Sequence, residues 1–394
     1  MIVHTCFNNT SEHGYSSSIL KSGICKYMRR HENDKLLWCI MEMALFHDHA
    51  KGSGLITNLV NRLKILLMEE ISPSEGFAIL RGSQLLDTYE KHRDQRELLM
   101  DFWNIIKHVK RSRITSYINN WWRYQEPQLM IQTIDKCESY RKPGDSDELL
   151  LLGENLIYFI EHNDERMFSL FRPMYDMKSG GGSRFRRKDP IYLWWEIILS
   201  YCLPHKELSI IFEFAISMFH RKSMIERPAF GIWMGVLLWK REKIDFNSHH
   251  YVPSTSDDLQ NYYTMMETIE IDSYVIHDYH VNKSLGLEHF AKNGGFVKDE
   301  DLSFLQDPHK YKEFYIQKKA EKDTQTKKKK KRRKISFDYE GVTYYSLGHK
   351  IFDEDLIHVG RLQDNSLIWL SSTFKSQHEI NRKYQTKEPV DSIP

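Results

Sequence analysis

Apolar residues recur every three or four positions in two consecutive stretches near the N-terminus. In 35–49 they are Leu36, Leu37, Ile40, Met41 and Ala44, and after the break "KGSG" at 51–54 they are Ile56, Leu59, Leu63, Leu66 and Leu67. This spacing places the apolar residues on one face of a helix. The pattern therefore predicts a helical hairpin that buries Leu63 in its seam, with Asn61, Arg62 and Lys64 on the other faces.

The same periodicity continues through most of the chain. It predicts further helices near 75–92, 94–109, 113–124, 146–160 and 190–202, and an aromatic helical block that extends to about residue 242. After residue 334 the sequence changes, because "ISFDYEGVTYYSL" and "LIWLSSTF" are rich in aromatic and β-branched residues, which favour strands. The predicted fold is mainly α, with a multi-helix bundle, a second helical block and a small β-containing C-terminal segment.

Glycine and charge mark the expected divisions of the chain. "KSGGGSRFRRKDP" at 178–190 combines a triglycine with the four cations at 184–188, and "EKDTQTKKKKKRRK" at 321–334 has the composition of a solvated linker. We expect a helical domain at 1–178, a second helical domain at 190–320, a basic linker at 321–334 and the β-containing segment at 335–394.

The cysteines and the apolar runs indicate in which cellular compartment the protein is expected. Five scattered cysteines without a CxxC pair favour reduced thiols over a disulfide framework or a structural zinc site. The sequence lacks a recognisable secretory signal, and its most apolar runs fall short of the roughly 20 residues that a membrane helix needs. We therefore expect an intracellular, reducing environment and no membrane partner.

Familiar catalytic motifs are missing. The sequence contains no P-loop, HExxH, GxSxG or EF-hand string, so we expect neither an enzyme built on these motifs nor a cofactor. The nearest group of metal ligands is His277, Asp278, His280 and His289. Three imidazoles are able to hold a transition metal, but histidine is common in this chain and chance spacing is the stronger interpretation.

Basic segments carry the main functional hypothesis, although the net charge is only +2. The stretch 108–124 mixes cations with Trp121, Trp122 and Tyr124, a combination that neutralises phosphates and stacks on bases. A solvated helix start followed by a core helix is the alternative, and it is the somewhat stronger interpretation. The eight contiguous cations at 327–334 are compatible with a polyanion contact and with a nuclear address. The candidate nucleic-acid contacts are Lys110, Arg111, Arg113, Arg184, Arg186, Arg187, Lys188, Lys327, Lys328, Lys329, Lys330, Lys331, Arg332, Arg333 and Lys334.

Three landmarks within 19–124 support a family resemblance. They are "SILKSGICKYMRRHENDKLLWCIMEM", "LVNRLKILLMEEISPSE" and "IIKHVKRSRITSYIN". This region resembles the C-terminal helical oligomerisation region of the RarA/MgsA replication-associated recombination ATPases, relatives of the clamp loaders. The resemblance covers about a quarter of the chain, and the ATPase module of the family does not precede it. A second stretch, 274–301, resembles segments in replication proteins of large DNA viruses.

The resemblance implies a collar-like bundle and a role for the two glutamates that end the second helix. Glu69 and Glu70 would lie at a buried or interfacial turn, paired with Arg62 or with a cation of the 110–113 segment. Two residues depart from the family pattern, since Glu70 stands where the family usually has Asp and Ser72 replaces a glycine.

Two hypotheses about function follow. The first is a non-enzymatic, DNA-associated accessory protein in replication, recombination or repair, located in a nucleus or a viral replication compartment and partnered by DNA and by itself or a separate ATPase. The second is a structural or oligomeric interaction protein whose basic run is only a nuclear address. A metal-dependent nuclease that uses Asp278 and the nearby histidines is a third interpretation.

Overall fold

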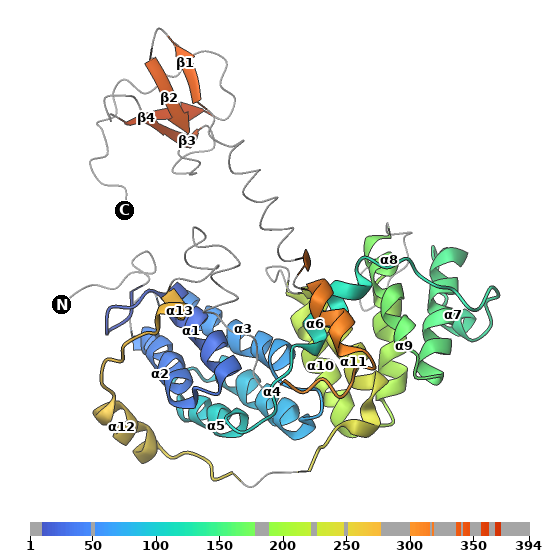
Figure 1. The fold of residues 1–394 in the computed structure, drawn as a ribbon, viewed down its shortest axis with the longest axis horizontal. Coiled ribbons are helices and arrows are strands. Elements are labelled where there is room, and N and C mark those ends of the chain that lie inside the picture. The colour runs from blue at the N-terminus through green and yellow to red at the C-terminus, as the bar shows by residue number, and fades with distance from the viewer. Residues whose placement is uncertain are drawn as a thin grey trace. The chain divides into compact units, whose positions relative to one another are not determined.

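The computed structural model divides the chain into two compact units, Met1–Lys318 and Lys319–Pro394. We refer to them as the helical unit and the C-terminal unit (Figure 1). The described residues are 10–48, 52–177, 189–221, 227–247, 251–276, 300–315 and 317–318 in the helical unit, together with 336–339, 342–346, 356–361 and 367–371 in the C-terminal unit.

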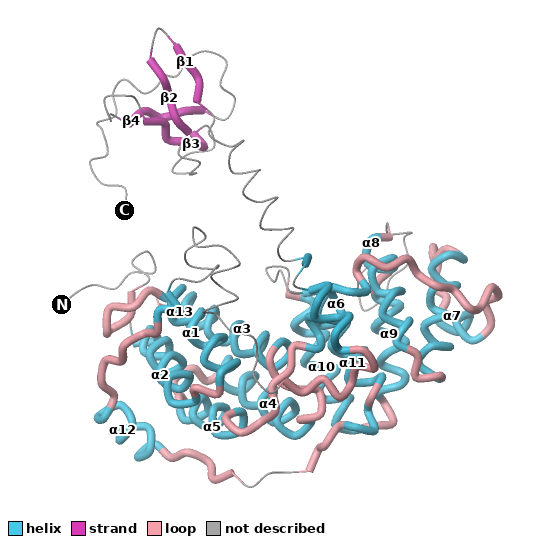
Figure 2. Tube along the Cα trace, in the orientation of Figure 1, coloured by secondary structure: helices cyan, strands magenta, loops and turns pink. Residues whose placement is uncertain are grey.

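Helices dominate the helical unit (Figure 2), and their bounds follow the predicted ranges closely. The α-helices are α1 (Ser17–Arg30), α2 (Asn33–Ala44), α3 (Ser53–Glu69), α4 (Gly76–Lys91), α5 (Glu97–Ile106), α6 (Ile114–Trp122), α7 (Asp147–Glu161), α8 (Phe171–Asp176), α9 (Tyr192–Cys202), α10 (Lys206–His220), α11 (Arg227–Trp239), α12 (Ser256–Met265) and α13 (Ser273–Ile276). Short 3-10 helices are η1 (Leu45–Asp48), η2 (Lys136–Tyr140), η3 (Glu165–Leu170) and η4 (Arg241–Lys243).

Local chemistry explains where helices begin and end. The Ser16 side chain accepts a hydrogen bond from the Ile19 N–H at the start of α1, and α1 ends at His31, which adopts the left-handed conformation with φ of 58°. Ser146 caps α7 in the same way through the Leu149 N–H. These caps satisfy backbone groups that a helix end leaves without an intrahelical partner.

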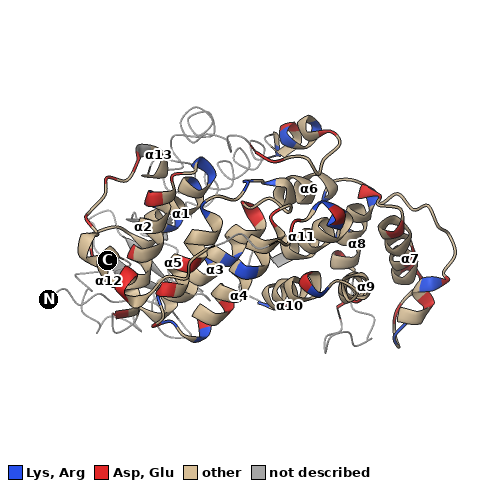
Figure 3. Ribbon diagram, turned by 90° about the horizontal axis from the view of Figure 1, so that it is seen from below, with Lys and Arg blue, Asp and Glu red and all other residues tan. Residues whose placement is uncertain are grey.

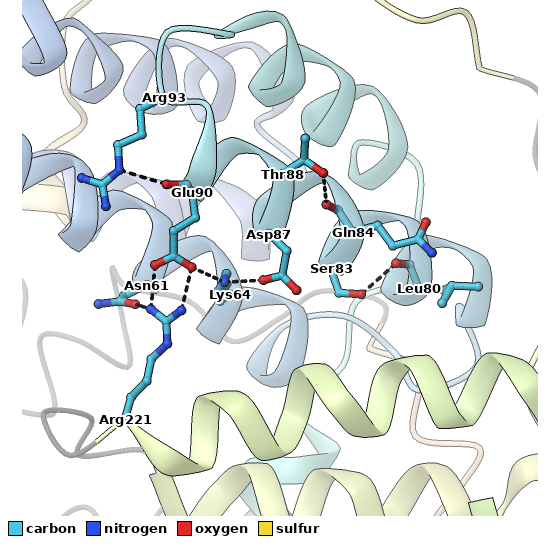
Figure 4. A network of polar contacts seen from close by, with 10 residues as sticks. All are labelled: Asn61, Lys64, Leu80, Ser83, Gln84, Asp87, Thr88, Glu90, Arg93 and Arg221. Carbon is cyan, nitrogen blue, oxygen red and sulfur yellow. Dashed lines mark hydrogen bonds and ion pairs between the residues drawn. The ribbon is translucent and has the colours of Figure 1, made fainter. Parts of the chain in front are cut away.

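The predicted seam of the N-terminal hairpin is confirmed, because Leu63 of α3 is fully buried. The prediction for its neighbour was wrong, since the Lys64 side chain is 1% exposed. Lys64 Nζ lies 2.5 Å from Asp87 Oδ1 and 2.7 Å from Glu90 Oε2, both on α4 (Figure 4). Two carboxylates thus offset the cost of burying this ammonium group.

The Lys64 network also joins the two expected helical domains. Arg221, directly after α10, donates to both carboxylate oxygens of Glu90, at 2.9 and 2.6 Å, and to Asn61 Oδ1 at 2.9 Å (Figure 4). Segments on both sides of 178–190 therefore belong to one compact unit. The structure divides the chain between Lys318 and Lys319 instead, near the start of the expected basic linker.

The aromatic block predicted beyond residue 190 forms part of the core. Trp194 and Trp195 of α9 and Trp233 of α11 are fully buried. Gly231 permits the close approach of η3–α8 to α11, because a Cβ there would lie 2.3 Å from Phe171 Cε2. The small residue in this helix is therefore a packing requirement.

In the C-terminal unit, the described strands form one antiparallel sheet in the order β1 (Ser336–Tyr339), β2 (Val342–Ser346), β3 (Leu356–Arg361) and β4 (Leu367–Ser371). Each strand pairs with the next one along the chain. The predicted fold class, mainly α with a small β-containing C-terminal segment, is confirmed.

Among the described residues, no helix combines the length and the apolar character that crossing a bilayer requires.

Candidate nucleic-acid interface

Two short segments cross at the end of α3 and the start of α6. Ile71 and Arg111 form an isolated antiparallel bridge. The Ser72 N–H donates to the Lys110 carbonyl at 3.0 Å, and the Ser112 N–H donates to the Glu70 carbonyl at 3.1 Å. We refer to residues 70–72 and 110–112 as the crossing. It brings the two glutamates and the 110–113 cations, which are about forty positions apart in sequence, to one place.

Glu70 is the charged centre of the crossing, with a side chain that is 1% exposed. Both of its carboxylate oxygens accept hydrogen bonds from Arg29 Nε on α1, at 2.8 and 2.9 Å, and Arg29 Nη2 forms a further contact. Arg113 Nε lies 3.8 Å from Glu70 Oε1. The expected buried turn is present, and a cation of the 110–113 segment pairs with Glu70, but the main partner is Arg29.

Glu69 differs from its neighbour because its side chain is half-buried, whereas that of Glu70 is 1% exposed. Burial and the adjacent Glu70 charge raise the pKa of Glu69, while Arg113, Arg29 and Arg62 oppose that rise. Arg62 Nη1 itself lies 3.7 Å from the Cys25 thiol. Arg62 is the alternative partner in the prediction, and its charge opposes the rise in the pKa of Glu69.

Arg111 corrects the prediction that it contacts a phosphate. Its side chain is fully buried, Nε donates to the Met28 carbonyl at 3.0 Å, and Nη1 donates to the carbonyls of Ile106 and Val109 at 2.7 and 3.1 Å. Burial lowers the pKa of Arg111 to about 10. The guanidinium ties α1 to the end of α5 and is closed off from an external polyanion.

Arg113 is also engaged within the protein. Its backbone N–H donates to Glu300 Oε1 at 2.8 Å, and its Nη2 donates to the Tyr315 hydroxyl at 2.8 Å. The Glu300 side chain is 1% exposed and is also contacted by Lys312 Nζ at 2.8 Å. Of the three predicted cations in this segment, Lys110 alone is exposed.

Segment 300–315 lies against the crossing and α6. The Asp301 N–H donates to the Arg111 carbonyl at 2.8 Å, and Asp301 Oδ2 accepts a hydrogen bond from Ser72 Oγ at 2.6 Å. Residues 308–315 then form a helix in which the Asp307 carboxylate accepts from the Lys310 N–H at 3.2 Å. Because Pro308 follows at the first helical position, this start has the usual chemistry of a helix N-terminus.

Aromatic rings and lysines gather where this helix packs on the end of α6. Trp121 and Phe314 have ring centroids 5.0 Å apart, and Tyr124 and Phe314 have centroids 5.8 Å apart. Lys310 Nζ lies 4.2 Å from the Trp121 centroid, and Lys318 Nζ lies 5.0 Å from the Tyr124 centroid. We refer to these five residues as the aromatic–lysine surface.

The aromatic–lysine surface is partly open to solvent. Tyr124 is 46% exposed and Lys310 is exposed, whereas Trp121, Phe314 and Lys318 are half-buried. Elsewhere in the helical unit, Lys and Arg are interspersed with Asp and Glu (Figure 3). The arrangement combines positive charge with accessible π faces, the two features that single-stranded nucleic acids need.

The cations and aromatic residues predicted to act together at 108–124 therefore lie in different places, some in the core and some on the aromatic–lysine surface. Trp121 and Tyr124 reach the aromatic–lysine surface, while Trp122 is 7% exposed and belongs to the core. Sequence reasoning missed Lys310, Phe314 and Lys318. Their spacing of four residues, which places them on one helix face, was the signal available in "HKYKEFYIQKK".

Two of the predicted basic groups lie outside the described residues. They are the cations at 184–188 and the run at 327–334, that is, Arg184, Arg186, Arg187, Lys188 and Lys327 to Lys334. Their roles remain predictions.

The candidate metal ligands His277, Asp278, His280 and His289 also fall outside the described ranges. Within those ranges, no group of three or more His, Cys, Asp or Glu side chains converges in a way that suits a metal ion.

Comparison with known proteins found no matching family model, no matching curated protein and no matching solved structure. The resemblance of 19–124 to the RarA/MgsA helical region therefore stays a prediction.

Proposed function

We propose that this protein is a non-enzymatic, DNA-associated accessory protein that acts in replication, recombination or repair. The observation that carries the proposal is the aromatic–lysine surface, in which Lys310 and Lys318 accompany Trp121, Tyr124 and Phe314. Three residues of this surface, Lys310, Phe314 and Lys318, come shortly before the end of the helical unit in the sequence, and the run of eight cations at 327–334 follows them.

Charge density supports DNA as the partner. Eight contiguous cations repel one another, and the negative charges of a polyanion relieve that repulsion. Binding also releases the counterions condensed on the polyanion, which favours the complex. The proposal assigns the bulk of the affinity to Lys327–Lys334 and gives the aromatic–lysine surface a more selective role. The predicted resemblance to a replication-associated family is consistent with this function.

Salt-dependent binding to DNA oligonucleotides tests the proposal. The full-length chain is compared with two variants. In the neutralised variant the eight cations at 327–334 are replaced by glutamine or serine, and in the all-arginine variant the lysines of this run are replaced by arginine. We expect the parent and the all-arginine chain to bind with an affinity that falls as salt rises, and the neutralised chain to lose most of that affinity.

The same variants separate this function from its rival. No binding by the parent chain at low salt contradicts the proposal. DNA affinity that survives neutralisation of 327–334 contradicts the assignment of the bulk of the affinity to this run, and loss of nuclear import alone identifies the run as a nuclear address.

A further inference from the structure

We infer that the aromatic–lysine surface is a stacking subsite for single-stranded nucleic acid, with Tyr124 as the ring on which an unpaired base stacks. This inference rests on the proposed function and adds a substrate class to it. Its basis is the geometry of Tyr124, Phe314 and the two lysines.

Tyr124 offers an accessible ring held in place by its neighbours. It follows α6 directly, its N–H donates to the Trp121 carbonyl at 3.2 Å, and its ring packs edge-on against Phe314. Trp121 also packs against Phe314, with a centroid distance of 5.0 Å. A ring that is supported in this way and yet 46% exposed loses little conformational freedom when a base stacks on it.

Cations flank the ring along the neighbouring helix. Lys310 and Lys318 lie eight positions apart, which corresponds to about 12 Å along a helix axis. At roughly 3.4 Å per stacked nucleotide, that distance spans about three to four phosphates. Lys318 Nζ also lies 5.5 Å from the Phe314 centroid, and Arg123 Cζ lies 6.0 Å from the Tyr124 centroid.

These features favour a single strand over a duplex. Bases in a duplex are already stacked and paired, so that an aromatic side chain finds no free base face there. Two cations, Lys318 and Arg123, lie beside the Tyr124 ring, and the Glu313 carboxylate on the lysine-bearing helix lies 3.7 Å from His309 Nδ1.

Fluorescence anisotropy with labelled oligonucleotides tests the subsite in the full-length chain. The probes are a single-stranded oligothymidylate, the corresponding oligouridylate and a duplex of equal length. We expect Tyr124→Ala to weaken binding to both single strands by roughly five- to one-hundred-fold, the range for loss of one stacked base. Tyr124→Phe keeps the ring and is expected to stay within about twofold of the parent.

The lysines have a separate readout in the salt dependence. Replacing Lys310 and Lys318 by glutamine should reduce the slope of log affinity against log salt by about 0.7 for each phosphate contact that is lost from a single strand. Lys91→Gln with Lys206→Gln is the matched control, since both lysines are exposed and lie outside the aromatic–lysine surface. Thermal melting confirms that each variant is folded.

The outcomes distinguish the subsite from the general function. A parent chain that binds no oligonucleotide overturns both. A parent chain that binds DNA, with single-strand affinity unchanged in Tyr124→Ala, overturns the subsite alone, and this is also the result expected if a protein partner occupies the surface. A loss of single-strand affinity in Tyr124→Ala with duplex affinity unchanged supports the subsite.

Discussion

Replacing Glu70 by glutamine removes the negative charge at the centre of the crossing. Arg29 and Arg113 then lose their ionic partner while their side chains stay largely enclosed, at 14% and 13% exposure. Breaking a buried pair costs roughly 3–5 kcal/mol, and partial solvent access to both arginines places this case near the lower limit. We expect Glu70→Gln to lower the free energy of unfolding by about 3 kcal/mol.

The neighbouring glutamate provides the matched control. Because burial and the Glu70 charge raise the pKa of Glu69, the fold disfavours its charged form. Glu69→Gln supplies a neutral side chain of the same shape and should leave stability unchanged or raise it.

Urea denaturation at neutral pH measures both variants. The expected result is a lower midpoint for Glu70→Gln with an unchanged dependence on urea. A double-mutant cycle with Arg29→Met then measures the coupling between the paired side chains. Equal stability of the two glutamine variants would refute the assignment of Glu70 as the buried, paired residue.

Three further predictions are tested by the same denaturation assay. Leu63→Asp and Lys64→Asp should each lower the free energy of unfolding by about 3 kcal/mol or more. The first places a charge in the core, and the second brings three carboxylates together. A mild effect of Lys64→Asp would contradict the buried position of Lys64. Burial acts to raise the pKa of Glu90, but hydrogen bonds from Arg221 and Lys64 outweigh burial and lower that pKa to about 2. Stability from this group should be present above about pH 4.3 and lost as pH falls towards 2, by about 1–2 kcal/mol after allowing for solvent screening, and Glu90→Gln should lack this loss. Gly153→Ala should destabilise by about 1–3 kcal/mol, because its Cβ would lie 2.3 Å from a buried sulfur, whereas Gly54→Ala meets nothing within 4 Å and should be tolerated.

Periodicity predicted the helices because it reports which face is apolar. Leu63 and Lys64 show the limit of this method, because periodicity assigns each position to the core or to the surface from the polarity of its own side chain. Lys64 is buried because α4 contributes two carboxylates and Arg221 completes the network from beyond α10. Those partners are 23 or more positions away in sequence, and no local pattern identifies them.

The candidate site shows the same limit. The family resemblance implied a paired turn at Glu70, but its main partner, Arg29, is 41 positions distant. Arg111 was predicted to be a surface cation, but in the structure its guanidinium donates hydrogen bonds to backbone carbonyls. Every residue has a backbone carbonyl, so the sequence does not reveal which ones accept these hydrogen bonds. The aromatic–lysine surface required segment 308–315 to pack on α6, a contact between residues nearly two hundred positions apart.

Photocrosslinking of the full-length chain to a single-stranded oligonucleotide that carries halogenated uracils tests the central claim most directly. Mass spectrometry of the crosslinked peptides locates the contacts on the chain. We predict crosslinks to the peptide that contains Tyr124, with further contacts in the peptides around 327–334, and their loss as salt rises. Crosslinks confined to other parts of the helical unit, or none above those of an unrelated acidic protein, would contradict the account.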